Sequence, residues 1–197
     1  MTFRAYNDPP LVQDRKAVNE MTITRSNEFF VDYHCPSITS DLWYGTFIGT
    51  LVADQDGDFE FGVCVFGTAR LYVDDELVVD NETAQRQGTI FFGSATLEEK
   101  GIAKMKKGKE YTVRCEFASA PASKLISDAV IASGGGALRI GGTWVIDAEQ
   151  EIRRAAELAK EVDQVIICAG LNVSYPFPSK YPTSLLIFIV RLGIRRL

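Results

Sequence analysis

The sequence predicts a mainly β protein, an antiparallel β-sandwich followed by one helix and one strand of an α/β domain. Two observations predict the sandwich. Polar and apolar residues alternate along residues 58–81, and turn-forming residues interrupt the alternation at short intervals. A third observation predicts the second part, because a stretch rich in serine, alanine and glycine at 118–136 precedes a helical pattern. The chain therefore reads as a sandwich, a connection and an incomplete α/β segment.

The alternation assigns the strands and their buried faces. Short or medium strands are expected at residues 3–8, 21–24, 43–52 and 111–118. Successive strand side chains point to opposite sides, so one face of the strand at 58–66 is predicted to enter the core with Phe59, Phe61, Val63 and Val65. Leu71 and Val73 continue this face on the next strand. Turn residues predict tight hairpins at 54–57, 67–68 and 106–109.

The α/β segment begins with a helix. Asp147 is expected to cap it, with Gln150 at the third helical position, and the helix is expected to end near Val162. Its apolar stripe comprises Ile152, Ala155, Ala156 and Ala159. Residues 165–169 are apolar on both faces, as in a strand buried in a parallel sheet. One helix and one strand cannot cover each other, so this segment is expected to be part of a larger domain.

The composition disfavours several partners. The 197 residues carry a net charge of −5 and a pI near 5.0, which argues against nucleic acid because phosphate binding needs clustered lysine and arginine. The basic run Lys104–Lys109 contains a glycine and is interpreted as a solvated turn. The N-terminal residues lack the apolar segment of a signal peptide, so the chain as written is expected to be cytoplasmic. No membrane partner is expected, because the apolar run Leu185–Val190 is far shorter than the about 20 residues of a span.

Cysteine and histidine, which often bind metals or take part in catalysis, are few in this sequence. Four cysteines, Cys35, Cys64, Cys115 and Cys168, form no C-x-x-C motif, so neither a metal nor a cofactor is expected. Cys64 and Cys115 are expected to be buried, reduced thiols. His34 is the only histidine and is interpreted as a hydrogen-bonded loop residue rather than a catalytic base. The glycines near residues 136–143 lack the lysine of a phosphate loop, so nucleotide binding is not expected.

Two stretches carry a family resemblance. Residues 71–81 read LYVDDELVVDN and residues 85–93 read QRQGTIFFG. This wording resembles the protective-antigen-like (PA-fourteen) β-sandwich that is inserted in fungal β-glucosidases of glycoside hydrolase family 3. The resemblance covers nearly all of residues 1–172. It implies a sandwich at 1–120, a connection at 121–142, a fragment of an α/β-sandwich domain at 143–172 and a tail at 173–197 that does not resemble the family.

The resemblance also implies a role. In the family the nucleophilic aspartate lies on a domain upstream of the sandwich and the acid/base carboxylate follows the segment ending at Asn172, so no catalytic residue is assigned here. This chain is expected to be inactive alone and to shape the aglycone side of the active site, which binds a β-glucoside or oligosaccharide. Phe91 and Phe92 are the predicted substrate-binding residues, because adjacent strand residues face opposite ways and both cannot enter one core. A core role for both rings remains open.

Two alternatives stay open. The first is a free-standing, calcium-dependent carbohydrate-binding sandwich, as in yeast adhesins, although the adhesin Asp-Asp pair would fall at Phe66-Gly67, which offers no side-chain oxygen to a cation. The second is that residues 173–197 are translated intron or a shifted reading frame rather than selected protein. The common intron donor sequence GTAAGT encodes Val-Ser, which is the sequence at Val173-Ser174. Whether the parent enzyme is cytoplasmic or secreted is also open.

Overall fold

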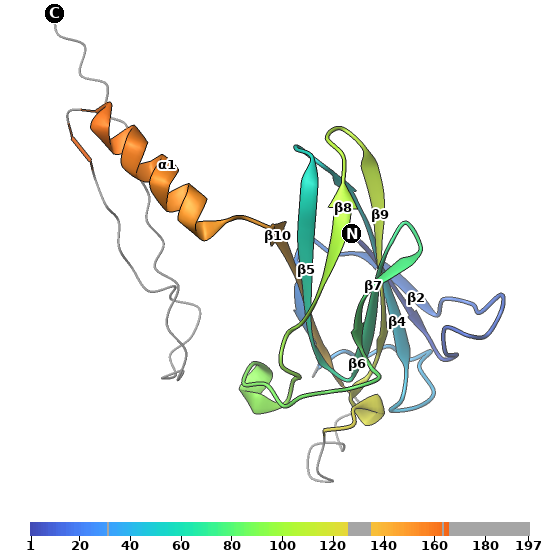
Figure 1. Ribbon diagram of the computed structural model, residues 1–197. Coiled ribbons are helices and arrows are strands. Elements are labelled where there is room, and N and C mark those ends of the chain that lie inside the picture. The colour runs from blue at the N-terminus through green and yellow to red at the C-terminus, as the bar shows by residue number, and fades with distance from the viewer. Residues whose placement is uncertain (31, 126–134, 163, 166–197) are drawn as a thin grey trace, which may run out of the picture. The chain divides into compact units, whose positions relative to one another are not determined.

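The computed structural model describes residues 1–30, 32–125, 135–162 and 164–165. The chain divides into two units between Val145 and Ile146. The first unit contains ten described strands (Figure 1). Their bounds are β1 Thr2–Tyr6, β2 Asn19–Thr22, β3 Asn27–Phe29, β4 Tyr44–Val52, β5 Gly57–Phe66, β6 Thr68–Val73, β7 Glu76–Asn81, β8 Glu99–Met105, β9 Glu110–Ala118 and β10 Ala137–Trp144. Two short 3-10 turns accompany them, η1 at Phe91–Gly93 and η2 at Ala120–Ala122.

The strands form two antiparallel sheets. The six-stranded sheet has the order β2-β1-β4-β9-β6-β7, and the four-stranded sheet has the order β3-β10-β5-β8. The two sheets contribute side chains to one main core, so the predicted antiparallel sandwich is confirmed.

The main core draws on alternate residues of both sheets. The six-stranded sheet supplies Phe3, Phe47, Leu71, Val79, Cys115 and Phe117 among others. The four-stranded sheet supplies Phe61, Val63, Val65 and Leu138. The face predicted from the alternation at 58–66 is therefore confirmed, with Phe59 only partly buried at its end. Rings gather where β1, β4 and β9 face Phe30, and Phe30 lies 5.4–5.6 Å from the ring centroids of Phe3, Trp43 and Phe117.

The chain passes from one sheet to the other at turns that were predicted as hairpins from the sequence. β4, β6 and β9 belong to the six-stranded sheet, whereas β5 and β8 belong to the four-stranded sheet. The predicted hairpins at 54–57, 67–68 and 106–109 are therefore wrong, because each of these turns carries the chain from one sheet to the other. Only the turn between β6 and β7 at Asp74-Asp75 is a tight hairpin among the described strands. Turn residues indicate a reversal of the chain, and the reversal alone does not determine whether the two strands pair.

Two of these crossing turns support each other. The Gly108 N–H donates to the Ala53 carbonyl oxygen at 2.7 Å, and the Ala53 N–H donates to the Lys109 carbonyl oxygen at 3.1 Å. The Asp56 carboxylate accepts from the Lys107 N–H at 2.7 Å. The basic run is therefore a turn whose backbone bonds to the neighbouring turn at 53–56, which agrees with its interpretation as a structural feature.

The sandwich extends beyond its predicted end at residue 120. β10 lies between β3 and β5 and pairs with β5 over eight residues, from Ala137 opposite Phe66 to Trp144 opposite Phe59. Residues 137–142, predicted as a connection, and residues 143–144, predicted as part of the α/β fragment, are thus a strand of the sandwich. This strand was missed in the sequence analysis, because the glycines at 141–142 and the serines and alanines that precede the strand have a low strand propensity.

The second unit is described only through helix α1, Ala148–Lys160, and a few residues beside it. The Asp147 carboxylate caps the helix by accepting from the backbone N–H groups of Glu149 and Gln150 at 3.0 and 3.2 Å, as predicted. The helix ends two residues before the predicted position. Most of the strand predicted at 165–169 and the whole tail at 173–197 lie outside the described residues.

The first prediction concerns the crossing at Gly67. This residue has φ +130°, and a Cβ built on it would lie 2.0 Å from the Ala118 carbonyl oxygen. Gly67→Ala in the full chain should lower the free energy of unfolding by about 3 kcal/mol or more. The substitution strains the backbone at this φ, and the added methyl group also forces the backbone at Ala118 to move. Gly108→Ala is the matched control, with φ +76° and nothing within 4 Å, and should cost only about 1–2 kcal/mol. Equal losses in urea denaturation would contradict the close approach.

The second prediction tests the domain boundary. A chain that ends at residue 120 lacks β10 and separates β3 from β5, so it should show no cooperative thermal transition. A chain that ends at Ile146 keeps all ten strands and should melt cooperatively, as followed by near-UV circular dichroism. Cooperative melting of the shorter chain would restore the boundary predicted from the sequence.

Candidate functional site

The segment that joins β7 to β8 ends in an aromatic tip. We call residues 86–97 the aromatic loop. Gln87 and Thr96 form an isolated antiparallel bridge at its base, and the Gly88 N–H donates to the Ala95 carbonyl oxygen at 2.9 Å. The predicted strand at Phe91-Phe92 is wrong, because these residues form η1 and have φ values of 50° and 58°. Aromatic residues rarely adopt this left-handed conformation, so the loop holds both rings at a cost in backbone strain.

Three phenylalanine rings gather at this tip, and we call Phe29, Phe91 and Phe92 the aromatic patch. The Phe29 and Phe91 rings stack with centroids 5.4 Å apart and an interplanar angle of 18°. The Phe92 ring lies 6.0 Å from Phe29. Phe92 is 91% exposed and Phe29 is 44% exposed. In Figure 1 the light green turn of η1 lies at the lower end of the sandwich. Exposed aromatic faces of this kind are suited to binding an apolar or sugar ring.

The two predicted site residues differ in burial. Phe91 packs against a small second cluster formed by Phe66, Ala95, Ala120 and Ala137, whereas Phe92 points into solvent. Phe91 is therefore the more buried of the two rings, but it lies outside the main core. The reason is the left-handed turn, which replaces the strand alternation on which the prediction rested.

Sequence reasoning missed Phe29. A usable signal was present, because Phe29 and Phe30 form an adjacent pair, as Phe91 and Phe92 do. Phe30 lies in the main core, and its neighbour Phe29 lies outside it. A pair of adjacent large apolar residues on an extended segment places one of them on the outer face.

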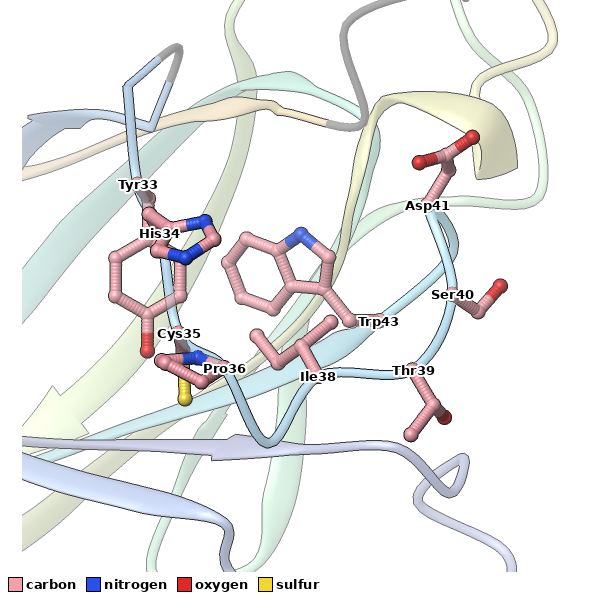
Figure 2. A pocket seen from close by; sticks show the side chains of 9 residues that line it. All are labelled: Tyr33, His34, Cys35, Pro36, Ile38, Thr39, Ser40, Asp41 and Trp43. Atoms are coloured by element: carbon pink, nitrogen blue, oxygen red, sulfur yellow. The ribbon is translucent and has the colours of Figure 1, made fainter.

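A pocket of about 610 Å³ lies at the segment between β3 and β4 (Figure 2). Its walls include Tyr33, His34, Cys35, Asp41 and Trp43. The Tyr33 hydroxyl accepts from Asn19 Nδ2 at 2.8 Å, and burial raises the Tyr33 pKa. His34 is exposed at the rim, and Figure 2 shows the Asp41 carboxylate pointing away from its ring. The pocket thus does not bring an acid to orient this histidine, and the interpretation of His34 as a loop residue is retained.

The aspartates of the turns are occupied by structural contacts. Asp74 accepts from Lys109 Nζ and from the Thr112 N–H, both at 2.9 Å, and the Lys109 hydrogen bond lowers its pKa. Asp75 lies 3.2 Å from Arg114 Nη2, and Asp80 accepts from the Glu82 and Thr83 N–H groups. Within the described ranges no group of three or more His, Cys, Asp or Glu side chains is placed to hold a metal ion. The calcium-dependent alternative therefore finds no support here.

The described cysteines, Cys35, Cys64 and Cys115, carry free thiols. Cys64 and Cys115 are buried as predicted. Burial raises the pKa of both thiols, to about 11 for Cys64, so neither is a reactive nucleophile at neutral pH. Cys168 lies outside the described residues. The described helix is too short and too polar to cross a membrane.

The sequence matches one known domain family and is similar to named proteins. Residues 4–142 match the family model of the PA14 domain. The chain is 46% identical over 170 residues to a protein named probable beta-glucosidase I from Aspergillus clavatus, covering 86% of this chain and 20% of that protein. It is 42% identical over 171 residues to probable beta-glucosidase J from Emericella nidulans, covering 87% and 20%. The chain thus spans about a fifth of the length of the curated relatives it matches.

A solved structure shares the fold. The β-glucosidase from Kluyveromyces marxianus, which has also been determined in complex with glucose, superposes with a TM-score of 0.69 and 30% identity. The superposition covers 81% of this chain and 18% of that protein.

The third prediction separates the roles of the two tip residues in stability. Phe91→Ala should lower the free energy of unfolding of the full chain by about 1–3 kcal/mol, less than a fully buried ring, because it removes the stack on Phe29 and part of the second cluster. Phe92→Ala should be nearly neutral, since this ring is 91% exposed. Phe92→Gly should be about 1 kcal/mol more stable than Phe92→Ala, because glycine tolerates the positive φ. Denaturant titrations that give Phe92→Ala the larger loss would contradict this assignment.

Proposed function

The chain belongs to the PA14 domain family, and we propose that it is the sandwich domain of a larger β-glucosidase, where its aromatic patch shapes the aglycone side of the active site. The similarity to two β-glucosidases of which it spans about a fifth supports this proposal. Phe92 would bind the leaving group of a β-glucoside or oligosaccharide, and Phe91 would hold the loop beneath it.

The single observation that carries the proposed role is the exposed Phe92 ring. Exposing this side chain in a left-handed turn has no benefit for the stability of the sandwich, because it buries little surface and adds strain. Strained and exposed aromatic residues on loops are typical of binding sites. An aromatic face packs against the apolar face of a sugar or an aryl group without needing a directed hydrogen bond.

We propose a role for this chain in binding the substrate and no role in the chemical step. Retaining hydrolysis of a glycoside uses two carboxylates about 5–5.5 Å apart, one as nucleophile and one as acid/base. The turn aspartates of this chain bond to its own lysine, arginine and backbone groups. We propose, from the family resemblance, that both catalytic carboxylates and the glucose subsite lie in parts of the parent enzyme outside this chain.

The fourth prediction tests this role in the full-length parent enzyme. Phe92→Ala should raise KM for substrates with a bulky leaving group by roughly 5- to 100-fold and leave kcat nearly unchanged, because it removes binding that is similar in the ground and transition states. Substrates with a small leaving group should be affected much less. The present chain, assayed alone as the control, should give no turnover above buffer. An unchanged KM for both classes of substrate would exclude Phe92 from the subsite.

A further inference from the structure

We infer that a buried polar network centred on Asn81 and Thr96 positions the aromatic loop, so that the aromatic patch is held from inside the sandwich. Asn81 is the last residue of β7 and Thr96 lies near the end of the aromatic loop. Their exposed fractions are 0% and 1%. The consequence for substrate selectivity rests on the proposed function, whereas the positioning of the loop does not.

Asn81 connects three segments of the chain. Its Nδ2 group donates to the Val63 carbonyl oxygen on β5 and to Thr96 Oγ1, both at 2.8 Å. A longer bond reaches the Leu97 carbonyl oxygen at 3.5 Å. All three partners are oxygen atoms, so a rotated amide would place Oδ1 against two carbonyl oxygens. The network therefore needs Asn81 as a donor and Thr96 as an acceptor.

Thr96 replaces a missing strand neighbour of β5. The pairing of β8 with β5 ends at Val63 opposite Glu99, two residues before Val65. Thr96 continues it, because its N–H donates to the Val65 carbonyl oxygen at 2.9 Å and its Oγ1 accepts from the Val65 N–H at 3.0 Å. Without this hydroxyl the buried Val65 N–H would lack its hydrogen-bond acceptor, and an unpaired buried N–H lowers the stability of the fold. Loss of the hydroxyl thus favours movement of the loop.

The network is coupled to the aromatic patch through Ala95. This residue is fully buried in the second cluster, against which Phe91 packs, and its backbone bonds across the loop to Gly88. Phe91 in turn stacks on Phe29. A shift of Thr96 is therefore transmitted through Ala95 to the rings at the tip. Asn81 and Thr96 are positioning residues, because neither lies at the surface that would touch a substrate.

Amide hydrogen exchange on the full chain tests the inference directly. Thr96→Val keeps the shape of the side chain and removes the acceptor, so the backbone amides of Val65, Gly88 and Leu97 should exchange at least about tenfold faster. Amides of β4 and β9 should keep their rates. Thr96→Ser retains the hydroxyl and should restore slow exchange in the loop.

Thr46→Val is the matched control. Thr46 is also buried, at 3% exposure, and its Oγ1 accepts from Arg15 Nη2 at 2.7 Å on the other sheet. This variant also loses one hydroxyl contact, yet exchange in the aromatic loop should not change. If Thr96→Val does not fold, the unaltered chain still provides the test, because the Val65 and Thr96 amides should exchange far more slowly than those of Phe92 and Gly93. Equal rates at these positions would overturn the inference.

The outcome can be separated from that of the proposed function. If exchange in the loop is unaffected by Thr96→Val, the positioning inference is wrong, whatever Phe92→Ala does to KM. If exchange accelerates selectively, the inference holds even where Phe92→Ala leaves KM unchanged and the proposed function fails. If both hold, Thr96→Val in the parent enzyme should raise KM for bulky leaving groups with kcat preserved, and Thr96→Ser should restore it.

Discussion

The structure depends on one constraint, which is that strands adjacent in the sequence mostly lie in opposite sheets around a shared core. The crossing at Gly67 brings backbone close to another segment of the sandwich. Gly67 shows how closely the chain passes, since any side chain there would meet the Ala118 carbonyl oxygen. The crossing turns also bond to one another, as those at residues 53–56 and 106–109 do.

The pairing of β8 with β5 ends at Val63, and beyond it the aromatic loop takes the place of β8 beside β5 through Thr96. The loop thus begins and ends on groups that belong to the sandwich, while its tip carries rings that do not enter the main core. Firm anchoring at the base and strain at the tip are compatible because different interactions govern them. Buried hydrogen bonds fix the base, and the stack of Phe91 on Phe29 stabilises the left-handed turn.

The charged residues at the turns pair with charged groups nearby. Asp74 and Asp75 pair with Lys109 and Arg114 at the turn of the single tight hairpin. These pairs are partly exposed, so they contribute little to stability, but they occupy the carboxylates that a cation would require. An acidic chain with many aspartates can thus lack a metal cluster throughout its described part. The exposed aromatic rings form the surface that we propose binds a ligand.

The class of fold, the core face of β5 and the cap of α1 could be predicted from the sequence, because alternation, helical period and capping are local properties. The sequence also singled out Phe91 and Phe92 as candidate binding residues. The three-dimensional structure was needed to show that the predicted hairpins are crossings, that β10 belongs to the four-stranded sheet and that Phe29 joins the patch. Strand pairing and the meeting of Phe29 with Phe91 depend on contacts between segments far apart in the chain. No local pattern encodes such contacts, because a turn residue bends the chain in the same way whichever sheet the next strand enters.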